Sequence, residues 1–207
     1  YIGGAGNGFS KGLIDQLRIF QKQLSSSEVS TLYAETASTV ESLDPLSEDT
    51  TDTLQVLGDT SCIATYQFEN DETDLSGNYD GTGTEIQYAA GRYGQAASFN
   101  GSASKVDIGT LGTTFENNFS FSLWFNLNTI ASSGIATLFT TFEDYYCYAF
   151  IRDSDKKLEV RVENTSTGYA IKSTSTFGTY GVWHHLAATK SSSDGLKIYI
   201  NGSLENT

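Results

Sequence analysis

Proline occurs once in this sequence, cysteine twice and methionine not at all. Long apolar runs are also lacking, and none approaches the roughly 18 residues that a membrane-spanning helix needs. We therefore expect no membrane insertion. Because the sequence has no initiator methionine and no basic-then-apolar leader, we expect the chain to be a piece of a longer protein.

The two cysteines, Cys62 and Cys147, lie far apart, with no C-x-x-C motif and no cluster of histidines nearby. This pattern argues against a zinc site, which needs closely spaced ligands. Two interpretations stay open from the sequence. The cysteines are either two buried thiols within strands or the two halves of a disulfide.

Basic residues are absent from Gln23 to Gly91, a stretch that holds 14 of the 25 acidic residues. Such a stretch repels phosphate backbones, so we exclude nucleic acid as a partner. It can attract cations, or it can keep a linker solvated.

Glycine, serine, threonine, tyrosine and phenylalanine are abundant, and this composition favours strands and turns. From Cys62 onward, short runs rich in β-branched and aromatic residues follow one another, separated by turn signals such as DSDKK and SSSDG. This spacing predicts an all-β fold, an antiparallel β-sandwich or jelly roll, and argues against βαβ units.

The opening residues contain the one short helix that we expect. Residues 13–20 read as a strand, and residues 25–35 read as a helix. The helix begins with a capping box, in which Ser25 accepts from the backbone of Glu28 and the Glu28 carboxylate reaches back. Its apolar stripe consists of Val29, Leu32 and Tyr33. Residues 37–60, rich in acids, serine and threonine, then read as a linker.

Several stretches together resemble one family. YQFENDETDLSGNYDGTGT, GQAASFNGSASKVDIG, FSFSLWFN, VWHHLAATK and LKIYINGSLENT resemble the concanavalin A-like, laminin-G-like domain family, in the order that the family shows. The opening FSKGLIDQLRIFQKQLSSSEVSTLY resembles the final strand and trailing helix of the same family. The resemblance implies a jelly-roll β-sandwich, but it does not specify a ligand.

The order of these motifs divides the chain in an unusual way. Residues 1–36 resemble the closing strand and helix of such a domain, and residues 61–207 resemble a domain that lacks its own final strand. Two arrangements stay open. The chain is either a slice of a tandem array, or a circularly permuted domain in which the acidic linker lets residues 1–36 fold back.

Catalysis is not expected from these residues. Glu159 and Glu163 share one strand face with Arg161 between them, which is typical of a charge-paired sheet face rather than of an acid–base pair. His184 and His185 are adjacent in a strand, so they point to opposite faces and cannot act as one unit.

A calcium site is implied by the resemblance and by one residue of the first strand. The alternation of strand residues places the Asp15 carboxylate on the face of Leu17 and Ile19, where it needs hydrogen-bond donors or a cation. In similar proteins an aspartate at this position helps to hold a structural Ca²⁺. The resemblance supplies the other ligands as backbone carbonyls near Glu69 and Gly101, and oxygen ligands suit Ca²⁺. The alternative is that Asp15 only accepts backbone N–H bonds in a turn.

Trp124 is the first candidate for sugar binding. It lies on the strand face opposite its apolar neighbours, where a flat ring beside hydroxyl groups can stack on a sugar, unless a loop or a sheet edge covers it. Tyr145 and Tyr146 are further candidates. We therefore expect a lectin-like or adhesive repeat of an extracellular or virion-surface protein, whose partners are a cell-surface glycan or protein and neighbouring repeats. The alternative is a structural spacer that binds no sugar.

Overall fold

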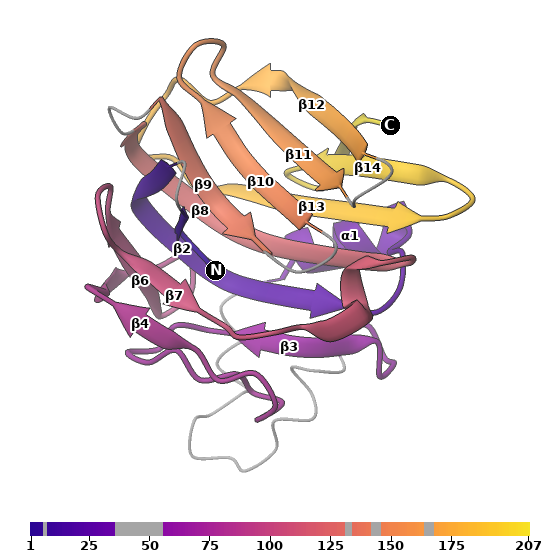
Figure 1. The fold of residues 1–207 in the computed structure, drawn as a ribbon, viewed down its shortest axis with the longest axis horizontal. Helices are drawn as coiled ribbons and strands as arrows, with labels where there is room; N and C mark the ends of the chain where they lie inside the picture. The colour runs from indigo at the N-terminus through magenta and orange to yellow at the C-terminus, as the bar shows by residue number, and fades with distance from the viewer. Residues whose placement is uncertain (6–7, 36–55, 131–133, 142–145, 164–167) are drawn as a thin grey trace.

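The computed structural model describes residues 1–5, 8–35, 56–130, 134–141, 146–163 and 168–207. The described residues form antiparallel strands, one α-helix, α1 (Ser26–Tyr33), and one short 3₁₀ helix (Gly112–Phe115). The strands stack in two layers (Figure 1). The predicted all-β antiparallel sandwich with one short helix is thereby confirmed.

The larger layer is a nine-stranded sheet. Its strands, in spatial order, are β15 (Ser203–Asn206), β14 (Gly195–Ile200), β13 (His184–Ser191), β8 (Phe119–Ile130), β2 (Gly8–Phe20), β6 (Gln95–Asn100) and β5 (Gln87–Ala90). Two further strands pair with β2, namely β1 (Gly4–Ala5) and β3 (Cys62–Tyr66).

The second layer is built from two smaller sheets. One has the order β12 (Gly168–Thr176), β11 (Lys157–Glu163), β10 (Tyr146–Arg152) and β9 (Ile135–Thr140), and the other pairs β4 (Thr82–Thr84) with β7 (Lys105–Asp107). Ile2 joins them, because it forms β-bridges with Phe139 of β9 and with Val106 of β7. The start of the chain is therefore part of the second layer as well as of the first.

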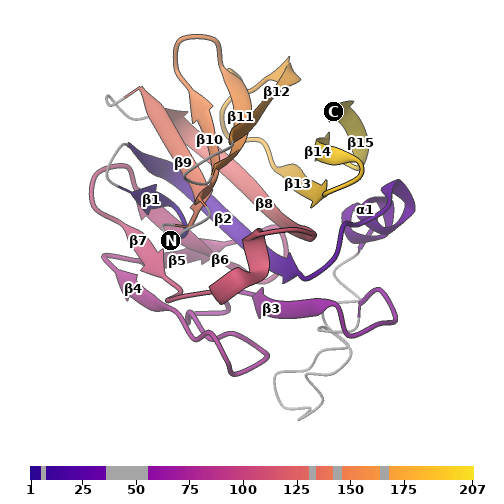
Figure 2. The ribbon, with the colours of Figure 1, turned by 45° about the vertical axis from the view of Figure 1, so that its right-hand side comes forward.

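The opening segment occupies the middle of the larger layer. Figures 1 and 2 show the indigo β2 beside β8, and it pairs with β8 on one edge and with β6 and β3 on the other. In this structure, residues 8–20 thus pair with strands of residues 61–207 of the same chain.

The main core lies between the two layers. Apolar side chains from both layers meet there and are almost fully buried, among them Ile14, Leu17, Ile19, Phe121, Leu123, Phe125, Ala149, Ile151, Leu158 and Val160. Strand residues that alternate toward this space are apolar, which is why the period-2 pattern of β8, β10 and β11 could be recognised in the sequence.

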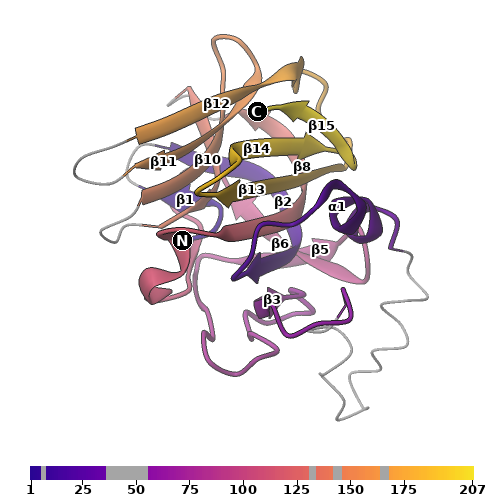
Figure 3. The same ribbon diagram turned by 90° about the vertical axis from the view of Figure 1, so that its right-hand side faces the viewer.

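Helix α1 covers the outer face of the larger layer (Figure 3). The predicted capping box is confirmed, since the Ser25 hydroxyl accepts from the Glu28 N–H at 3.3 Å and the Ser25 N–H donates to Glu28 Oε2 at 2.7 Å. Val29 and Leu32 are buried in a second, smaller cluster with Phe20 of β2. The helix thus buries its apolar stripe on the sheet rather than on the main core.

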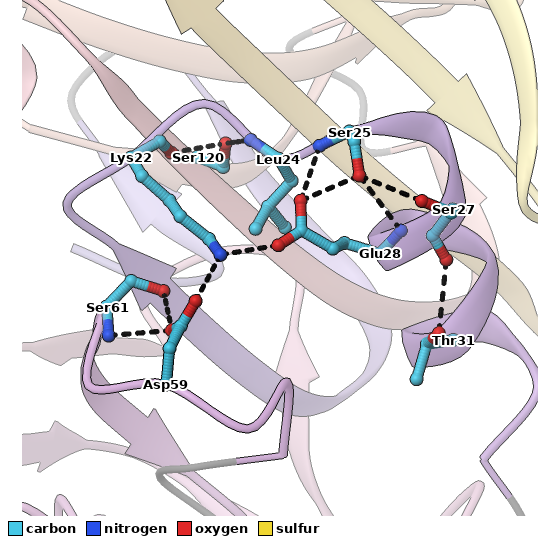
Figure 4. A network of polar contacts seen from close by, with 9 residues as sticks. All are labelled: Lys22, Leu24, Ser25, Ser27, Glu28, Thr31, Asp59, Ser61 and Ser120. Carbon is cyan, nitrogen blue, oxygen red and sulfur yellow. Dashed lines mark hydrogen bonds and ion pairs between the residues drawn. The ribbon is translucent and has the colours of Figure 1, made fainter.

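A polar network fixes the beginning of α1 to the segment that precedes β3 (Figure 4). The ammonium of Lys22 bridges the carboxylates of Glu28 and Asp59. Hydrogen bonds from Lys22 and Ser61 lower the pKa of Asp59 to about 2. The hydroxyl of Ser120 in β8 also accepts from the Leu24 N–H at 2.9 Å. These contacts join the larger sheet, the beginning of α1 and the segment that precedes β3.

A buried ion pair fixes the other end of α1. Arg18 Nη1 of β2 lies 2.6 Å from Glu35 Oε2, and both side chains are almost fully buried. The Tyr93 hydroxyl donates to the backbone carbonyl of Glu35 at 2.5 Å. Because separating a buried pair leaves an uncompensated charge, these contacts strongly favour one position of the helix end.

Both cysteines are buried and free. Cys62 belongs to the small cluster under α1, whereas Cys147 belongs to the main core between the layers. The interpretation as two buried thiols is confirmed, and the disulfide does not form in this structure. Burial raises the pKa of both thiols, which keeps them protonated and unreactive near neutral pH.

We predict that residues 56–207 cannot fold without residues 1–35. The shortened chain lacks the middle strand of the larger layer, so it exposes two strand edges and an apolar slot. It should be poorly soluble, and a peptide of residues 1–35 should restore cooperative melting in circular dichroism. The matched control is the same peptide carrying Leu17→Asp, which should not restore it. Cooperative melting of 56–207 alone would contradict the prediction.

Candidate functional site

A bulge in β2 decides where the candidate metal ligand points. The pairing of β2 with β8 shifts register between Asp15 and Arg18, and Gln16 within this shift has a φ of 51°. The extra residue reverses the alternation. Leu17 still enters the core, but Asp15 lies opposite Trp124 on the outer face of the sheet. The prediction that Asp15 shares the face of Leu17 was therefore wrong.

The Asp15 carboxylate is fully buried in a turn that follows β5. Its Oδ2 atom accepts from the backbone N–H groups of Arg92 at 2.8 Å and of Tyr93 at 3.0 Å. Its Oδ1 atom is buried and has no hydrogen-bond partner in the described part of the chain. Burial raises the pKa of Asp15 to about 7, although the two N–H groups lower it, and the charge of Glu69 raises it further.

Glu69 binds the same turn from the other side. Its Oε2 atom accepts from the Gln95 N–H at 3.0 Å. Two glycines make this approach possible: a Cβ at Gly94 would lie 2.1 Å from Glu69 Oε1, and a Cβ at Gly91 would lie 2.7 Å from Asp15 Oδ2. The motif GRYG thus brings two carboxylates to one turn, where the charge of Glu69 disfavours ionisation of Asp15.

Gly101 lies elsewhere. It follows the far end of β6, where a Cβ at this position would lie 2.8 Å from the Cβ of Lys11. The structure therefore brings together Asp15 and Glu69 of the three residues predicted to surround calcium, and it separates Gly101 from them. Among the described residues, no group of three or more His, Cys, Asp or Glu side chains is arranged to hold a metal ion.

Trp124 is covered rather than open to solvent. Only 3% of it is exposed, and the Tyr33 ring of α1 stacks on it with centroids 5.6 Å apart. The Arg92 guanidinium lies 4.5 Å from the centre of a Trp124 ring, and the His185 ring lies 5.1 Å away. The sequence left open whether another part of the chain covers this ring, and the structure shows that it is covered. In this arrangement no face of Trp124 is available to a sugar.

Of the two tyrosine candidates, Tyr145 lies outside the described residues. Tyr146 begins β10 and is 47% exposed. It stands at the end of a row of aromatic side chains, because Tyr146, Tyr148 and Phe150 alternate with the core residues Cys147 and Ala149.

This row belongs to an open surface, which we call the β10–β12 face. The paired registers place on it Tyr146, Tyr148, Phe150 and Arg152 of β10, Lys157, Glu159, Arg161 and Glu163 of β11, and Gly168, Ala170 and Lys172 of β12. Helix α1 lies on the larger layer, on the opposite side of the sandwich (Figures 2 and 3).

The centre of the β10–β12 face is a fixed array of rings and guanidinium groups. The guanidiniums of Arg152 and Arg161 lie 4.9 Å and 5.8 Å from the centre of the Phe150 ring, and the Tyr148 ring lies 5.0 Å away. Both arginines also bind Glu159, which is 2% exposed. Arginine side chains held in this way keep further N–H donors available for a partner.

The acidic pair on this face is not arranged for acid–base work. Burial raises the pKa of Glu159, but hydrogen bonds from Arg161 and Arg152 outweigh it and hold the pKa below its usual value. Lys172 Nζ lies 3.7 Å from Glu159 across the strands. A carboxylate held ionised by three cations cannot serve as a general acid near neutral pH. The prediction that charges are paired across this face is confirmed.

A cavity of about 320 Å³ opens at the edge of the second layer. Its walls are residues 107–111, the first residue Tyr1, and Thr140 at the end of β9 with the following Thr141. Sequence reasoning missed it, because its walls are distant in the chain and meet only when Tyr1 pairs with Thr140. No sequence motif predicts that these distant segments lie side by side.

Comparison with known proteins gives one match. A family model described as the concanavalin A-like lectin/glucanases superfamily matches residues 99–207, slightly more than half of the chain. No curated protein and no solved structure matches the chain. Within the described ranges, none of the helical residues form a stretch that is long and apolar enough to cross a membrane.

We predict that Trp124 is shielded from solvent by Tyr33. In a Trp183→Phe background, where Trp124 is the remaining indole, acrylamide should quench the fluorescence weakly. Adding Tyr33→Ala should increase quenching several-fold because it uncovers the stacked face. Tyr180→Ala, which removes a similarly exposed tyrosine at another place, is the control. Strong quenching before Tyr33 is replaced would show that the helix does not cover the indole.

Proposed function

The chain belongs to the concanavalin A-like lectin/glucanase superfamily, and from this premise we propose that it is a non-catalytic, lectin-like adhesive module of an extracellular or virion-surface protein. Its partner is a glycan or another protein on a cell surface. Family membership supports a sandwich that presents a recognition surface, but the choice of surface depends on this chain's own residues.

The observation that carries the proposal is the difference between the two outer faces of the sandwich. The outer face of the larger layer is covered by α1, and its candidate sugar contact Trp124 is buried. The β10–β12 face instead presents Tyr146 and Tyr148 beside the guanidinium of Arg161. Aromatic rings stack on the apolar faces of sugars, and guanidiniums donate to hydroxyl or carboxylate oxygens.

Absence of catalysis is part of this proposal. The candidate acid, Glu159, is enclosed by cations, and Glu163 is exposed and lies 3.7 Å from Arg161. Glycoside hydrolysis needs a proton donor and a second carboxylate on opposite sides of the scissile bond. A surface of stacked rings with neutralised acids is instead suited to binding.

A structural spacer that binds no sugar is the second candidate, and one observation favours it. Trp124 is covered by Tyr33 and Arg92 instead of facing solvent, so a potential ligand ring serves packing. Neighbouring repeats of the same protein would then be the partners of the module.

A glycan array with the intact chain distinguishes these candidates. We expect binding to at least one glycan class, and we expect Tyr146→Ala to weaken it about threefold to tenfold because one stacking contact is lost. Tyr169→Ala is the matched control: Tyr169 is also exposed, but its ladder partner Val162 points into the core. A folded chain that binds no glycan would favour the spacer.

We also propose a structural Ca²⁺ beside Asp15 and Glu69. The buried carboxylate of Asp15 and the half-buried carboxylate of Glu69 share one turn, and the Asp15 Oδ1 oxygen lacks a partner among the described residues. Such a pair needs a proton or a cation, and oxygen donors suit Ca²⁺. A bound ion would neutralise the pair, with the remaining coordination left to backbone carbonyls and water.

The calcium proposal predicts a pH-dependent effect of the ion on stability. The folded pKa of Asp15, about 7, lies above its ordinary value of 3.8, so without calcium Asp15 lowers stability progressively as the pH rises from about 4 to about 7. That loss is on the order of 4 kcal/mol when it is complete. Calcium should therefore raise the melting temperature more at pH 8 than at pH 5.5.

Asp15→Asn should remove both the calcium effect and the loss of stability with rising pH, because an amide stays neutral. Asp194→Asn, at an exposed aspartate in the turn between β13 and β14, should leave both unchanged. Differential scanning calorimetry with calcium or EGTA measures these effects. Identical melting of the original chain in calcium and in EGTA at pH 8 would exclude the site.

A further inference from the structure

The cavity at the edge of the second layer is built by pairing at the start of the chain. The Thr140 N–H donates to the Tyr1 carbonyl at 2.9 Å, and Ile2 bridges β9 and β7. Since Ile2 points into the core, its neighbour Tyr1 lies on the outer side, as does Asp107 beside the core residue Val106. An aromatic ring and a carboxylate thus line one cavity.

Only one of the two oxygens of the Asp107 carboxylate accepts a hydrogen bond among the described residues. Its Oδ1 atom accepts from the Gly109 N–H at 3.0 Å, which fixes the side chain. Its Oδ2 atom has no hydrogen-bond partner among the described residues. Gly109 has a φ of +64°, so the chain turns sharply here and the exposed Thr110 lines the same cavity. An anionic acceptor and a hydroxyl therefore lie at one opening.

The other wall is rigid. The Thr140 hydroxyl donates to the Thr141 carbonyl at 3.2 Å, and the Thr141 hydroxyl accepts from the Cys147 N–H at 2.9 Å. Both threonines are buried. The Lys105 ammonium lies 4.4 Å from the centre of the Tyr1 ring, and this cation–π contact holds the ring in place. A preformed cavity costs little conformational entropy when a ligand enters.

We propose that this cavity binds a single neutral pyranose, the terminal sugar of the glycan that the module recognises. The inference rests on the proposed lectin-like function and names its ligand class. The Asp107 carboxylate accepts from sugar hydroxyls, and the Tyr1 ring packs on the C–H face of the sugar. Sialic acid and uronic acids are disfavoured, because their carboxylate would meet that of Asp107.

The size and position of the cavity support this choice. Its volume of about 320 Å³ is at the lower end of the range of ligand pockets, about 300–1,000 Å³, which suits one sugar ring rather than a chain of them. Thr140 is paired with Tyr148 of the β10–β12 face. The rest of a glycan whose end sits in the cavity can therefore extend over that face.

The test uses the intact chain and a panel of methyl pyranosides, with N-acetylneuraminic acid as the acidic member. Saturation-transfer NMR detects binding, and ¹H–¹⁵N spectra locate it. We expect at least one neutral pyranoside to bind with a millimolar dissociation constant and to shift the amide signals of Gly109 and Thr110. Asp107→Asn should weaken binding about tenfold while keeping the acceptor for the Gly109 N–H. Asp153→Asn, at an exposed aspartate in the turn between β10 and β11, is the matched control.

The outcomes separate this inference from the proposed function. If a glycan array is positive but no neutral pyranoside binds, or if the shifted amides lie on β10 and β11 alone, the cavity inference is overturned and the lectin-like function stands. Unchanged affinity in Asp107→Asn overturns it as well. If neither the array nor the pyranosides show binding, both proposals fall. Preferential binding of N-acetylneuraminic acid at Thr110 would overturn the assignment to neutral sugars.

Discussion

Every part of the molecule depends on the hydrogen bonds that β2 makes with β8 on one edge and with β6 and β3 on the other. This strand lies in the middle of the larger layer and supplies Ile14, Leu17 and Ile19 to the main core. The residues just before it join β9 to β7 in the second layer, and the residues just after it form α1. One segment thus completes both layers, closes the core and covers an outer face.

The position of α1 gives the sandwich two different sides. Its apolar stripe packs on Phe20 and Tyr199, its Tyr33 ring stacks on Trp124, and the buried pair of Arg18 and Glu35 fixes its end. Because these contacts use the rings of the larger layer for stability, the recognition that we propose is assigned to the second layer. On the β10–β12 face the rings of Tyr146, Tyr148 and Phe150 are neither covered by the helix nor part of the main core, and the charges around them are balanced by ion pairs. Packing on one side thus leaves the other side for the partner that we propose.

The sequence was a reliable guide where local rules apply. The strand series from Cys62 onward and the capping box of Ser25 and Glu28 follow from alternation and from helix-end chemistry, and both are present. The side on which Asp15 lies was not predictable, because it depends on a bulge at Gln16 with a positive φ that no glycine signals. The covering of Trp124 and the cavity beside Asp107 arise from contacts between residues that are distant in sequence, which periodicity cannot reveal.

The central place of β2 also governs how the chain can reach this fold. Its neighbour β8 begins about a hundred residues later in the sequence, and the four strands β9 to β12 that pack against both come later still. Contacts of such long range must wait for loop closure, so folding rate falls as their share rises. During synthesis β2 emerges before its partners, and the edge that pairs with β8 stays open until β8 has left the ribosome. The acids that follow it raise its solubility during this interval, when an exposed apolar strand is most prone to aggregate.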